Sequence, residues 1–311
     1  MSAPFEQLAF DDVPEQPRRP HPWARCTTAR VTVATADLGT VEIAYRTFGS
    51  GPPLLLVHGL MTAGYSWRYV LDGLGAHYTL LIPDLPGAGD SSMPDHALTP
   101  AAMADAIIAF VDALGVRGAP VIGNSMGGYL CMHAALRDAG VFGHVVNLHS
   151  PGVPTGRMRA LWLALRVLPS RTIVDRLVRR DPERWVHRNV HYWDESLKSR
   201  EEHRVFAAPL RREAGRRGFY RALRDTLDVR AMSRFVQALE ARPFPVPLTL
   251  VYATRDPVVP PKVGDRLRTL VPTATFIRLS DASHFAHVDA ADRFVAAVLP
   301  RLTAAPTTPA R

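Results

Sequence analysis

Two kinds of hydrophobic pattern alternate along the chain and together predict an α/β fold. Short apolar or alternating runs, which favour strands, are bounded by turn-forming residues. Eight such runs occur, at residues 30–34, 40–48, 54–57, 78–82, 119–122, 145–148, 246–253 and 275–279. The turn Asp37-Leu38-Gly39 joins the first two runs and predicts an antiparallel hairpin.

Helical periodicity fills most of the stretches between these runs. It is found near residues 67–75, 100–114, 126–139, 263–270 and 290–302. Thr99 or its neighbour is a candidate N-cap, and Gly115 is typical of a helix end. Because strands alternate with helices, the pattern predicts a mostly parallel, eight-stranded sheet with helices on both faces.

The pattern changes between residues 152 and 242, where strand signals almost disappear. This segment is helical in period, and Pro169, Pro182 and Pro209 interrupt it. It follows the sixth strand and would leave the sheet at the edge where open α/β sheets bind their ligands, so we predict a helical cap over that edge. The predicted organisation is an N-terminal arm at 1–26, of which the Pro-rich residues 1–24 are loosely held, a core at 27–151 and 243–302, the cap at 152–242, and a disordered tail at 303–311.

The positive charge of the chain is concentrated in the predicted cap. The 311 residues include 37 basic and 29 acidic side chains, a net charge of +8. Residues 152–242 hold 20 Arg and one Lys against 11 acidic side chains, or about +10 for this segment. No binding motif or aromatic interleaving accompanies the excess, so we expect no nucleic-acid partner. Solvated helix faces explain such an excess, and attraction of an anionic substrate or peripheral contact with a membrane remain open.

The bulk composition favours a cytoplasmic protein without a membrane-spanning segment. Cys26 and Cys131 are too few for a disulfide framework and suit a reduced environment. The N-terminus has no apolar signal core, and no run of about 18 apolar residues occurs. With 47% hydrophobic residues, the chain can form one large domain with an insertion, or two small domains. The sequence does not fix an oligomeric state.

The sequence Gly123-Asn124-Ser125-Met126-Gly127 lies between an apolar strand and a helical pattern, with Gly128 directly after it. A serine at such a turn is held in a strained conformation with Oγ pointing away from the sheet. Glycines flank it because a Cβ at those positions would collide with the neighbouring strand and helix. This arrangement predicts a nucleophile elbow, with a surface serine in a Gly-rich loop as the alternative.

Two loops after later strands supply the partners that such a serine needs. A serine hydroxyl is a weak nucleophile at neutral pH and requires a base, which a third group must orient. In a fold of this kind the chain order is Ser, then acid, then His. Asp256 follows the strand that ends near residue 253, and His284 follows the strand that ends at residue 279. Ser125, Asp256 and His284 are therefore the predicted catalytic residues.

These assignments have alternatives in the same loops. Asp256, which precedes a proline, also suits a simple turn, and His284 also suits a packed loop histidine. His287 is a second candidate base, three residues further on. Asp281 is too close to His284 in sequence to orient it. No acidic residue occurs between residues 148 and 171, which disfavours an acid after the preceding strand.

The negative charge that develops on a substrate oxygen needs fixed hydrogen-bond donors. The Met126 N–H lies at the start of the helix after the elbow, where the helix dipole also favours negative charge. Leu60, after His58-Gly59, is the expected source of the second N–H. We interpret His58 as bracing this loop through its ring. We expect no metal or cofactor, since His284-x-x-His287 lacks the Glu and the third ligand of a zinc helix.

Together these motifs resemble the α/β-hydrolase superfamily over roughly residues 27–302. Five features occur along the chain in the order typical of this family: the His58-Gly59 loop, the turn-rich loop at 84–91, the elbow at 123–128, Asp256 and His284. The resemblance implies an α/β-hydrolase fold with a catalytic triad and a helical cap inserted after the sixth strand. Members with an Asp nucleophile at the elbow include dehalogenases and epoxide hydrolases, and Ser125 argues against both reactions.

The amino-acid sequence of the elbow is similar to that of meta-cleavage-product hydrolases, which split a C–C bond in vinylogous diketones. Those enzymes usually have a Gly/Ser-Gly-Pro-Gly-like oxyanion loop. This chain has Leu60-Met61-Thr62-Ala63-Gly64 instead. The difference favours ester hydrolysis over C–C hydrolysis.

The combined prediction is a serine hydrolase that cleaves a carboxylic ester, or a similar acyl bond, of a small and largely apolar substrate through an acyl-enzyme. The alternatives on the same triad are a C–C hydrolase, a lactonase, a cofactor-free haloperoxidase and an acyltransferase. A non-catalytic binding protein of this fold is a more remote alternative. Cap residues predict an apolar acyl pocket, although each also suits the core of the cap. They are Trp162, Leu165, Tyr192 and Trp193, with Leu161 and Trp185 as further candidates.

Overall fold

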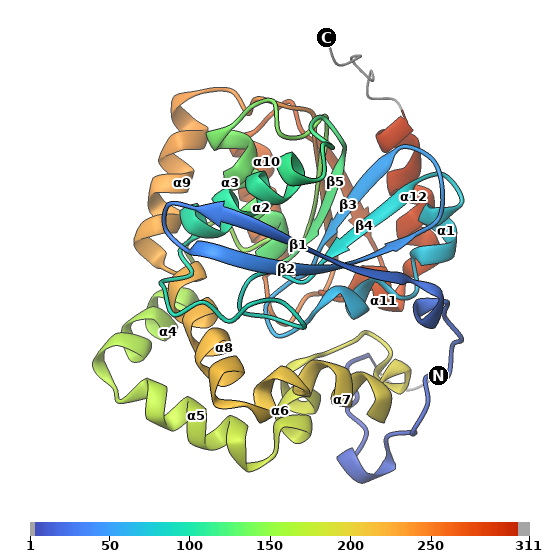
Figure 1. Ribbon diagram of the computed structural model, residues 1–311, viewed down its shortest axis with the longest axis vertical. Coiled ribbons are helices and arrows are strands. Elements are labelled where there is room, and N and C mark those ends of the chain that lie inside the picture. The colour runs from blue at the N-terminus through green and yellow to red at the C-terminus, as the bar shows by residue number, and fades with distance from the viewer. Residues whose placement is uncertain (1–3, 304–311) are drawn as a thin grey trace.

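The computed structural model describes residues 4–303 and contains one eight-stranded sheet (Figure 1). The strands lie in the order β1-β2-β4-β3-β5-β6-β7-β8. β2 is antiparallel to both of its neighbours, β1 and β4, whereas every other neighbouring pair is parallel, which confirms the predicted sheet. Their bounds are β1 Thr27–Thr35, β2 Gly39–Phe48, β3 Pro53–Val57, β4 Thr79–Pro83, β5 Val121–Asn124, β6 Val145–Leu148, β7 Leu248–Ala253 and β8 Thr275–Leu279.

Helices cover both faces of the sheet, as predicted. One face carries α2 Pro100–Ala113, α3 Met126–Arg137, α9 Val229–Ala241 and α10 Pro261–Leu270. The other carries α1 Leu71–Gly75, α11 Ala286–Asp289 and α12 Ala291–Thr303. Thr99 caps α2, because its Oγ1 accepts the Ala102 N–H at 3.1 Å. The helix predicted at 67–75 is divided into the 3-10 helix η3 Gly64–Trp67 and the short α1, where Gly73 and Gly75 weaken helix propensity.

Alternating side chains of the central strands divide the core into two layers. In β3, Leu55 and Val57 belong to the layer under α2 and α3, whereas Leu54 and Leu56 belong to the layer under α1 and α12. All four side chains are fully buried. Side chains of a strand point to opposite faces in turn, so a strand covered on both faces requires such a continuous apolar run. The carboxyl ends of these strands meet at one edge of the sheet, and Figure 1 shows the cap directly below it.

The segment between β6 and β7 is helical, as predicted. It holds α4 Gly156–Val167, α5 Ser170–Arg180, α6 Pro182–Asn189, α7 Arg200–Ala207, α8 Glu213–Thr226 and α9, with the 3-10 helices η4 Glu195–Leu197 and η5 Pro209–Arg211. The last helix, α9, lies beside the sheet. Its Phe235 ring packs against Tyr129 of α3, with ring centroids 5.1 Å apart. We therefore infer that the cap ends with α8 and that α9 belongs to the core.

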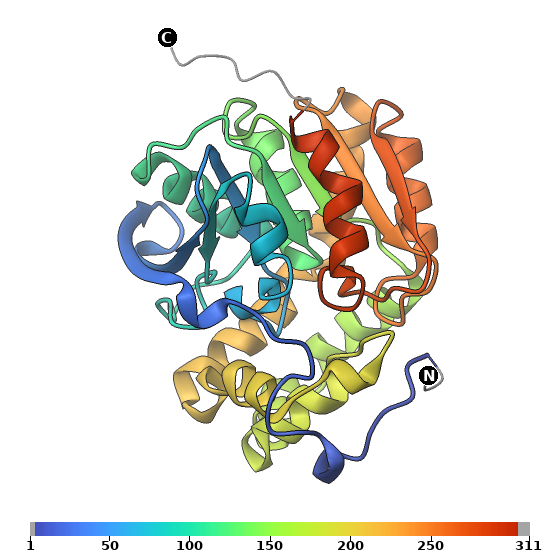
Figure 2. The same ribbon diagram turned by 90° about the vertical axis from the view of Figure 1, so that its right-hand side faces the viewer.

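The N-terminal arm packs along the cap, in contrast to the loose arrangement that its prolines predict (Figure 2). The Phe10 ring stacks on His203 of α7, with centroids 5.8 Å apart, and lies under the guanidinium of Arg200. The Arg200 N–H also donates to the Pro14 carbonyl at 2.8 Å. Prolines prevent regular secondary structure in the arm, but they do not prevent such contacts. The predicted tail after residue 303 lies outside the described residues.

Within residues 4–303, no helix is both long enough and apolar enough to cross a bilayer.

Candidate active site

Ser125 occupies a sharp turn between β5 and α3. Its φ of 53° and ψ of −122° form a conformation that residues with a side chain rarely adopt. The Ser125 N–H donates to the Leu148 carbonyl of β6 at 2.7 Å, and the Ser125 carbonyl accepts the Tyr129 N–H at 3.1 Å. The Ser125 side chain is partly exposed, whereas Asn124 and Met126 on either side are buried. This is the geometry of a nucleophile elbow.

Glycines make room for this turn. A Cβ on Gly123 would lie 2.6 Å from the Cα of Gly128, and a Cβ on Gly127 would lie 2.4 Å from the Val57 carbonyl oxygen of β3. Those neighbours are backbone atoms and cannot yield, so only glycine lets α3 begin directly against the sheet. The turn that exposes Ser125 therefore depends on these positions.

Asp256 and His284 approach each other from the loops after β7 and β8. His284 Nδ1 lies 2.7 Å from Asp256 Oδ2, while Asp256 Oδ1 accepts the N–H groups of Val258 and Val259 at 2.7 and 2.9 Å. Burial by itself would raise the pKa of Asp256, but the rings of His284 and His149 hold that pKa well below its usual range. The carboxylate is therefore ionised and held in one orientation.

A second histidine, His149, lies against the same carboxylate, and the sequence analysis did not identify it. Its Nδ1 is 2.9 Å from Asp256 Oδ2, at an angle too oblique for a well-aligned hydrogen bond. Its Nε2 accepts the Ala253 N–H at 3.0 Å, so the ring proton is on Nδ1 and faces Asp256. Burial lowers the pKa of His149, in opposition to the nearby carboxylate, and keeps the ring neutral. A polar residue directly after the parallel strand β6 is the signal that could have revealed it.

Asn124 connects the elbow to the histidine loop. Its Nδ2 donates to the His284 carbonyl at 3.0 Å and, more weakly, to the Leu148 carbonyl at 3.4 Å. Because Asn124 directly precedes Ser125, this bond fixes the His284 backbone relative to the serine. Nothing in the local sequence pattern indicates this role for the asparagine.

His287, the alternative base, lies away from the serine. Its ring is fully buried, with its centroid 4.3 Å from that of Trp67. Burial also lowers the pKa of His287 well below its ordinary value. Ser125 and His284 line a common cavity whose wall does not include His287. The geometry therefore favours His284 as the base.

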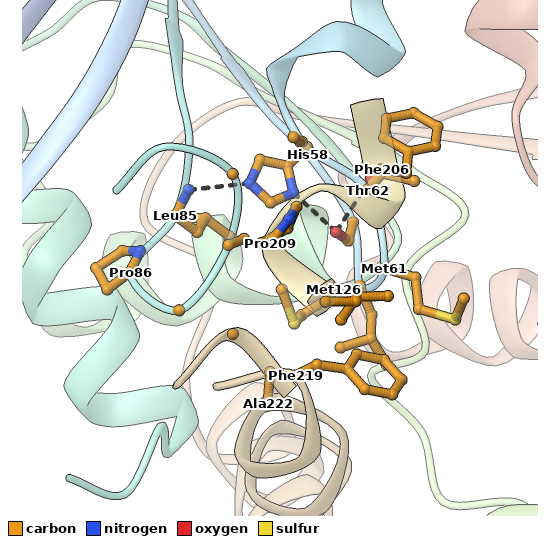
Figure 3. A pocket seen from close by; sticks show the side chains of 18 of the residues that line it. His58, Met61, Thr62, Leu85, Pro86, Met126, Phe206, Pro209, Phe219 and Ala222 are labelled. Atoms are coloured by element: carbon orange, nitrogen blue, oxygen red, sulfur yellow. Dashed lines mark hydrogen bonds between the residues drawn. The ribbon is translucent and has the colours of Figure 1, made fainter. Parts of the chain in front are cut away.

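His58 braces the loop after β3, the role predicted for it. Its Nε2 accepts the Leu85 N–H at 2.9 Å, and its Nδ1 lies 2.8 Å from the Gly59 carbonyl oxygen (Figure 3). Thr62 Oγ1 donates to the same carbonyl at 3.1 Å. Met61 takes a positive φ of 66°, so the loop is tightly wound and its backbone is directed by these bonds.

The braced loop passes directly over the serine. A Cβ on Gly59 would lie 3.0 Å from Ser125 Cβ. The N–H groups of Leu60 and Met126 make no hydrogen bond with other residues of the described part of the chain. Both residues line the same cavity as Ser125. Their N–H groups are thus available as donors to an oxyanion.

The cavity that holds Ser125 and His284 has a volume of about 190 Å³ and a mostly apolar wall. Core and cap both contribute to that wall, with Met158, Leu161, Val190, Leu227, Val258 and Phe285 among its residues. A smaller hollow of about 40 Å³ meets the same loop at Leu60 and Met61 (Figure 3). Phe206 and Phe219 of the cap line that hollow. The site is therefore enclosed by the cap and suited to apolar groups.

The four cap residues predicted to bind substrate do not line this cavity, and their side chains pack elsewhere. Leu165 is buried among cap helices, and Tyr192 is buried with its hydroxyl donating to Glu202 at 2.8 Å. The indole of Trp162 donates to Asp228 at 3.1 Å, and Trp193 packs edge-on against Phe5. Of the two further candidates, Leu161 lines the cavity and Trp185 packs near Phe219. Helical periodicity cannot distinguish the side of a cap helix that faces the site from the side that faces other cap helices.

Among residues 4–303, one group of three side chains is compact enough to be considered as a metal site. It consists of His149, Asp256 and His284, whose facing atoms lie within 4.8 Å of one another. The facing atoms are a carboxylate oxygen and two ring nitrogens that contact it at 2.7 and 2.9 Å. Both rings direct a nitrogen toward this carboxylate, so the three side chains form one buried polar cluster around Asp256.

Comparison with known proteins places this geometry in a family. The sequence matches the model of the alpha/beta hydrolase fold over residues 52–291, and the chain belongs to that family. The match includes Ser125, Asp256 and His284, together with the whole cap.

The relatives and solved structures include several hydrolases. A soluble epoxide hydrolase from Corynebacterium sp. (strain C12) is 34% identical over 108 residues, which are 35% of this chain and 38% of that protein. Haloalkane dehalogenase 2 from Mycobacterium tuberculosis is 28% identical over 275 residues, which are 85% of this chain and 93% of that protein. A thermophilic esterase from Thermogutta terrifontis, solved with malate bound, has a TM-score of 0.71 at 21% identity, covering 88% of this chain and 98% of that one.

The chain spans about two fifths of the length of the epoxide hydrolase, and the esterase is similar in fold alone. These similarities support a hydrolase, while the chemistry of the reaction depends on the residues of this chain.

Proposed function

We propose that this protein is a serine hydrolase that cleaves a carboxylic ester, or a similar acyl bond, of a small and largely apolar substrate. One observation carries the proposal. Ser125, in its strained turn, lines the same cavity as His284, whose Nδ1 is held at 2.7 Å by the buried Asp256. A nucleophile, a base and an orienting acid are the minimum that acyl transfer through serine requires.

In the proposed reaction His284 Nε2 takes the proton of Ser125 Oγ while that oxygen attacks the carbonyl carbon of the substrate. Asp256 occupies Nδ1, which leaves Nε2 for this transfer, and its negative charge stabilises the imidazolium that forms. The Leu60 and Met126 N–H groups hold the oxyanion. His284 then protonates the departing alcohol, and a water activated by the same ring cleaves the acyl-enzyme.

Ser125 disfavours the reactions after which the two relatives are named. A carboxylate that attacks an epoxide or haloalkane carbon forms an ester, and water can then cleave that ester at its carbonyl group. A serine oxygen that attacks the same carbon forms an ether, which has no carbonyl for water to attack. The protein would stop after one turnover, whereas an acyl substrate leaves a hydrolysable ester on Ser125.

The cavity supports an uncharged, apolar acyl group. Met158, Leu161 and Val258 supply apolar wall. Apart from the proposed base His284, Arg157 is the one acidic or basic side chain among the lining residues. The Arg157 guanidinium donates to the Pro257 carbonyl at 2.9 Å, so its charge is partly engaged at the rim. Binding of an acyl chain here would become more favourable in proportion to the apolar area buried, until the chain reaches the end of the cavity.

A series of p-nitrophenyl esters of increasing acyl length tests the proposal. We expect kcat/KM to rise with chain length and then fall when the chain exceeds the cavity. Leu161→Trp places a larger side chain in the wall and fills part of the cavity, so it should move the optimal acyl length toward shorter chains. The Ser125→Ala variant serves as the blank and should lose at least about 10³-fold in kcat. Ester turnover that survives Ser125→Ala would count against the proposal.

Two further substrates separate the alternatives on the same triad. A vinylogous diketone turned over faster than every ester would replace ester hydrolysis by C–C hydrolysis. An added alcohol that captures most of the acyl group in preference to water would indicate an acyltransferase. With neither result, ester hydrolysis stands.

A further inference from the structure

Six of the seven large hydrophobic residues that are exposed in the described part of the chain lie on two consecutive cap helices. They are Leu161, Leu163, Val167 and Leu168, at α4 and the turn after it, and Ile173 and Leu177 of α5. Val167 is the most exposed, at 72%. Single exposed apolar residues are ordinary, but their concentration on one helical hairpin is typical of an interaction surface. Figure 1 shows α4 and α5 at the outer corner of the cap.

The same helical hairpin is rich in arginine. Residues 156–180 include seven arginines and one acidic residue, Asp175, whose carboxylate is occupied by Arg216 of α8 at 2.7 Å. Arg166 pairs with Asp228, and Arg157 donates to a backbone carbonyl. Five others are exposed and form no ion pair with any residue in the range 4–303: Arg159, Arg171, Arg176, Arg179 and Arg180. The hairpin therefore combines apolar side chains with unneutralised positive charge.

This combination selects among the partners that an exposed apolar surface could have. A second copy of the chain would bring the same unpaired arginines face to face in a two-fold dimer, and like charges would oppose its formation. A polyanion such as a nucleic acid would pair with the arginines but leave Leu163 and Val167 in water. A bilayer with anionic headgroups accepts both, because apolar side chains enter the acyl boundary while arginines bind the headgroups.

We propose that the α4–α5 hairpin docks this protein on the surface of a bilayer that contains anionic lipids. The hairpin lies on the surface and does not cross the membrane. Leu163, Val167, Leu168, Ile173 and Leu177 insert, and the five unpaired arginines bind the headgroups. The docking surface does not depend on the proposed hydrolysis, because none of these side chains lines the cavity at Ser125.

The position of the hairpin gives docking a consequence for the site. Leu161, on the first helix of the hairpin, is both exposed and part of the cavity wall. Arg157 and Met158 of the same helix also line the cavity. The docked surface thus adjoins the cavity, and an apolar substrate dissolved in the bilayer would meet α4 before it meets water.

Co-flotation of the full chain with vesicles tests this proposal. The probes are vesicles of phosphatidylcholine alone and vesicles of phosphatidylcholine mixed with phosphatidylglycerol. We expect binding to the mixed vesicles that weakens as salt is added, and little binding to the neutral ones. Binding to neither, or equal binding to both, overturns the proposal. The Ser125→Ala variant should float like the natural chain, which separates this result from any failure of the proposed hydrolysis.

Two double variants divide the surface into its parts. Leu163→Gln/Val167→Gln removes two exposed apolar side chains and should weaken binding to mixed vesicles by roughly tenfold or more. Arg171→Gln/Arg176→Gln removes two charges and should weaken binding by about tenfold or more. The matched control Arg268→Gln/Arg301→Gln removes two exposed core arginines and should retain binding. Each altered residue is exposed, so folding is preserved, and the unfolding transition of each variant checks this.

The pattern across the variants distinguishes the partners. The proposal is contradicted if the chain does not bind vesicles but is retained on a polyanion, and if that retention falls in the arginine variant but not in the apolar variant. Dimerisation in light scattering that is lost in the apolar variant, again without vesicle binding, contradicts it as well. Turnover of a short, water-soluble ester should be unchanged in the Leu163→Gln/Val167→Gln variant.

Discussion

His149 Nδ1 lies 2.9 Å from Asp256 Oδ2, the same oxygen that His284 Nδ1 contacts at 2.7 Å. Both rings are buried, and the Ala253 N–H fixes the tautomer of His149 so that its proton faces the carboxylate. The carboxylate is thus held between two histidines. Only His284 shares a cavity with Ser125. We interpret His149 as a positioning residue that acts through Asp256.

Replacing His149 should slow the reaction more than it weakens substrate binding. Removing a hydrogen bond to a charged group costs about 1.5–3 kcal/mol, and the oblique contact here belongs at the lower end, or about tenfold in kcat. We expect this loss in His149→Leu, with KM nearly unchanged. His149→Asn retains an N–H donor and tolerates the positive φ of 55°, so it should recover most of kcat. Equal activity of the two variants, after correction for the folded fraction, would rule out positioning.

The sequence permitted prediction of the triad because each member follows a recognisable strand. Ser125, Asp256 and His284 come after β5, β7 and β8, and the carboxyl ends of parallel strands lie at one edge of the sheet. Continuous apolar runs such as 54–57 identify buried strands without knowledge of their neighbours. The fold and the candidate triad are therefore properties of local pattern and chain order.

The residues that the sequence analysis missed depend on contacts that local pattern does not encode. His149 follows β6 as Asp256 follows β7, but the chain order expected for this fold suggests only an acid at that position. The aromatic character of the cap residues predicts contact with substrate, whereas the Tyr192 hydroxyl is bonded to Glu202 inside the cap. Periodicity predicts that a cap helix has an apolar face, but it does not predict what that face contacts. The packing of the cap helices on one another decides which face is directed toward the site.

Gly127→Ala should destabilise the protein strongly, because the added Cβ would lie 2.4 Å from the Val57 carbonyl oxygen and 2.5 Å from that of His58. Backbone atoms of a central strand cannot move aside without separating α3 from the sheet. We expect a loss of at least about 2 kcal/mol in the free energy of unfolding, measured in urea.

Gly156→Ala is the matched control for this substitution. An added Cβ there meets nothing within 4 Å, and the residue is exposed at the start of α4. Alanine is a better helix former than glycine, so the stability of this variant should be unchanged or slightly higher. Equal stability of the two variants would contradict the close packing inferred for the elbow.

Acid should destabilise the folded protein between about pH 6.5 and pH 4. Burial lowers the pKa of His133 to about 4, with Arg137 and Arg234 acting in the same direction, and burial lowers the pKa of His203 to about 3. Six other histidines have lowered pKa values for which burial is the leading cause: His21, His58, His144, His149, His187 and His287. The unfolded chain binds protons near pH 6.5 and the folded chain does not, so stability is complete above that pH and is lost as pH falls.

Two buried acidic groups act in the opposite direction, because burial raises the pKa of both Asp289 and Glu202. Burial raises the pKa of Asp289 to about 6, so the folded state binds the extra proton between about pH 3.8 and pH 6 and is favoured as pH falls. Two carboxyl groups oppose eight histidines, so the net effect of acid remains destabilising.

His133→Phe should reduce this dependence on pH. The ring lies between Tyr129 and Phe235, at centroid distances of 4.6 and 4.8 Å, so phenylalanine suits the site. Urea unfolding at pH 7.5 and pH 5 should show a difference in free energy smaller by about 2 kcal/mol than in the natural chain. His96→Gln, at an exposed position, is the control and should leave the difference unaltered. If this difference in the free energy of unfolding were the same in His133→Phe as in the natural chain, His133 would not be the source of the pH dependence assigned to it.

The most direct measurement of the central claim is covalent labelling of the folded protein with a fluorophosphonate, followed by intact mass and peptide mapping. We predict one adduct per chain on Ser125, no adduct in Ser125→Ala, and labelling slowed by at least about 10³-fold in His284→Ala. A folded natural chain that takes up no label, or one labelled at another residue while Ser125→Ala still hydrolyses esters, would contradict the assignment of Ser125 as the nucleophile.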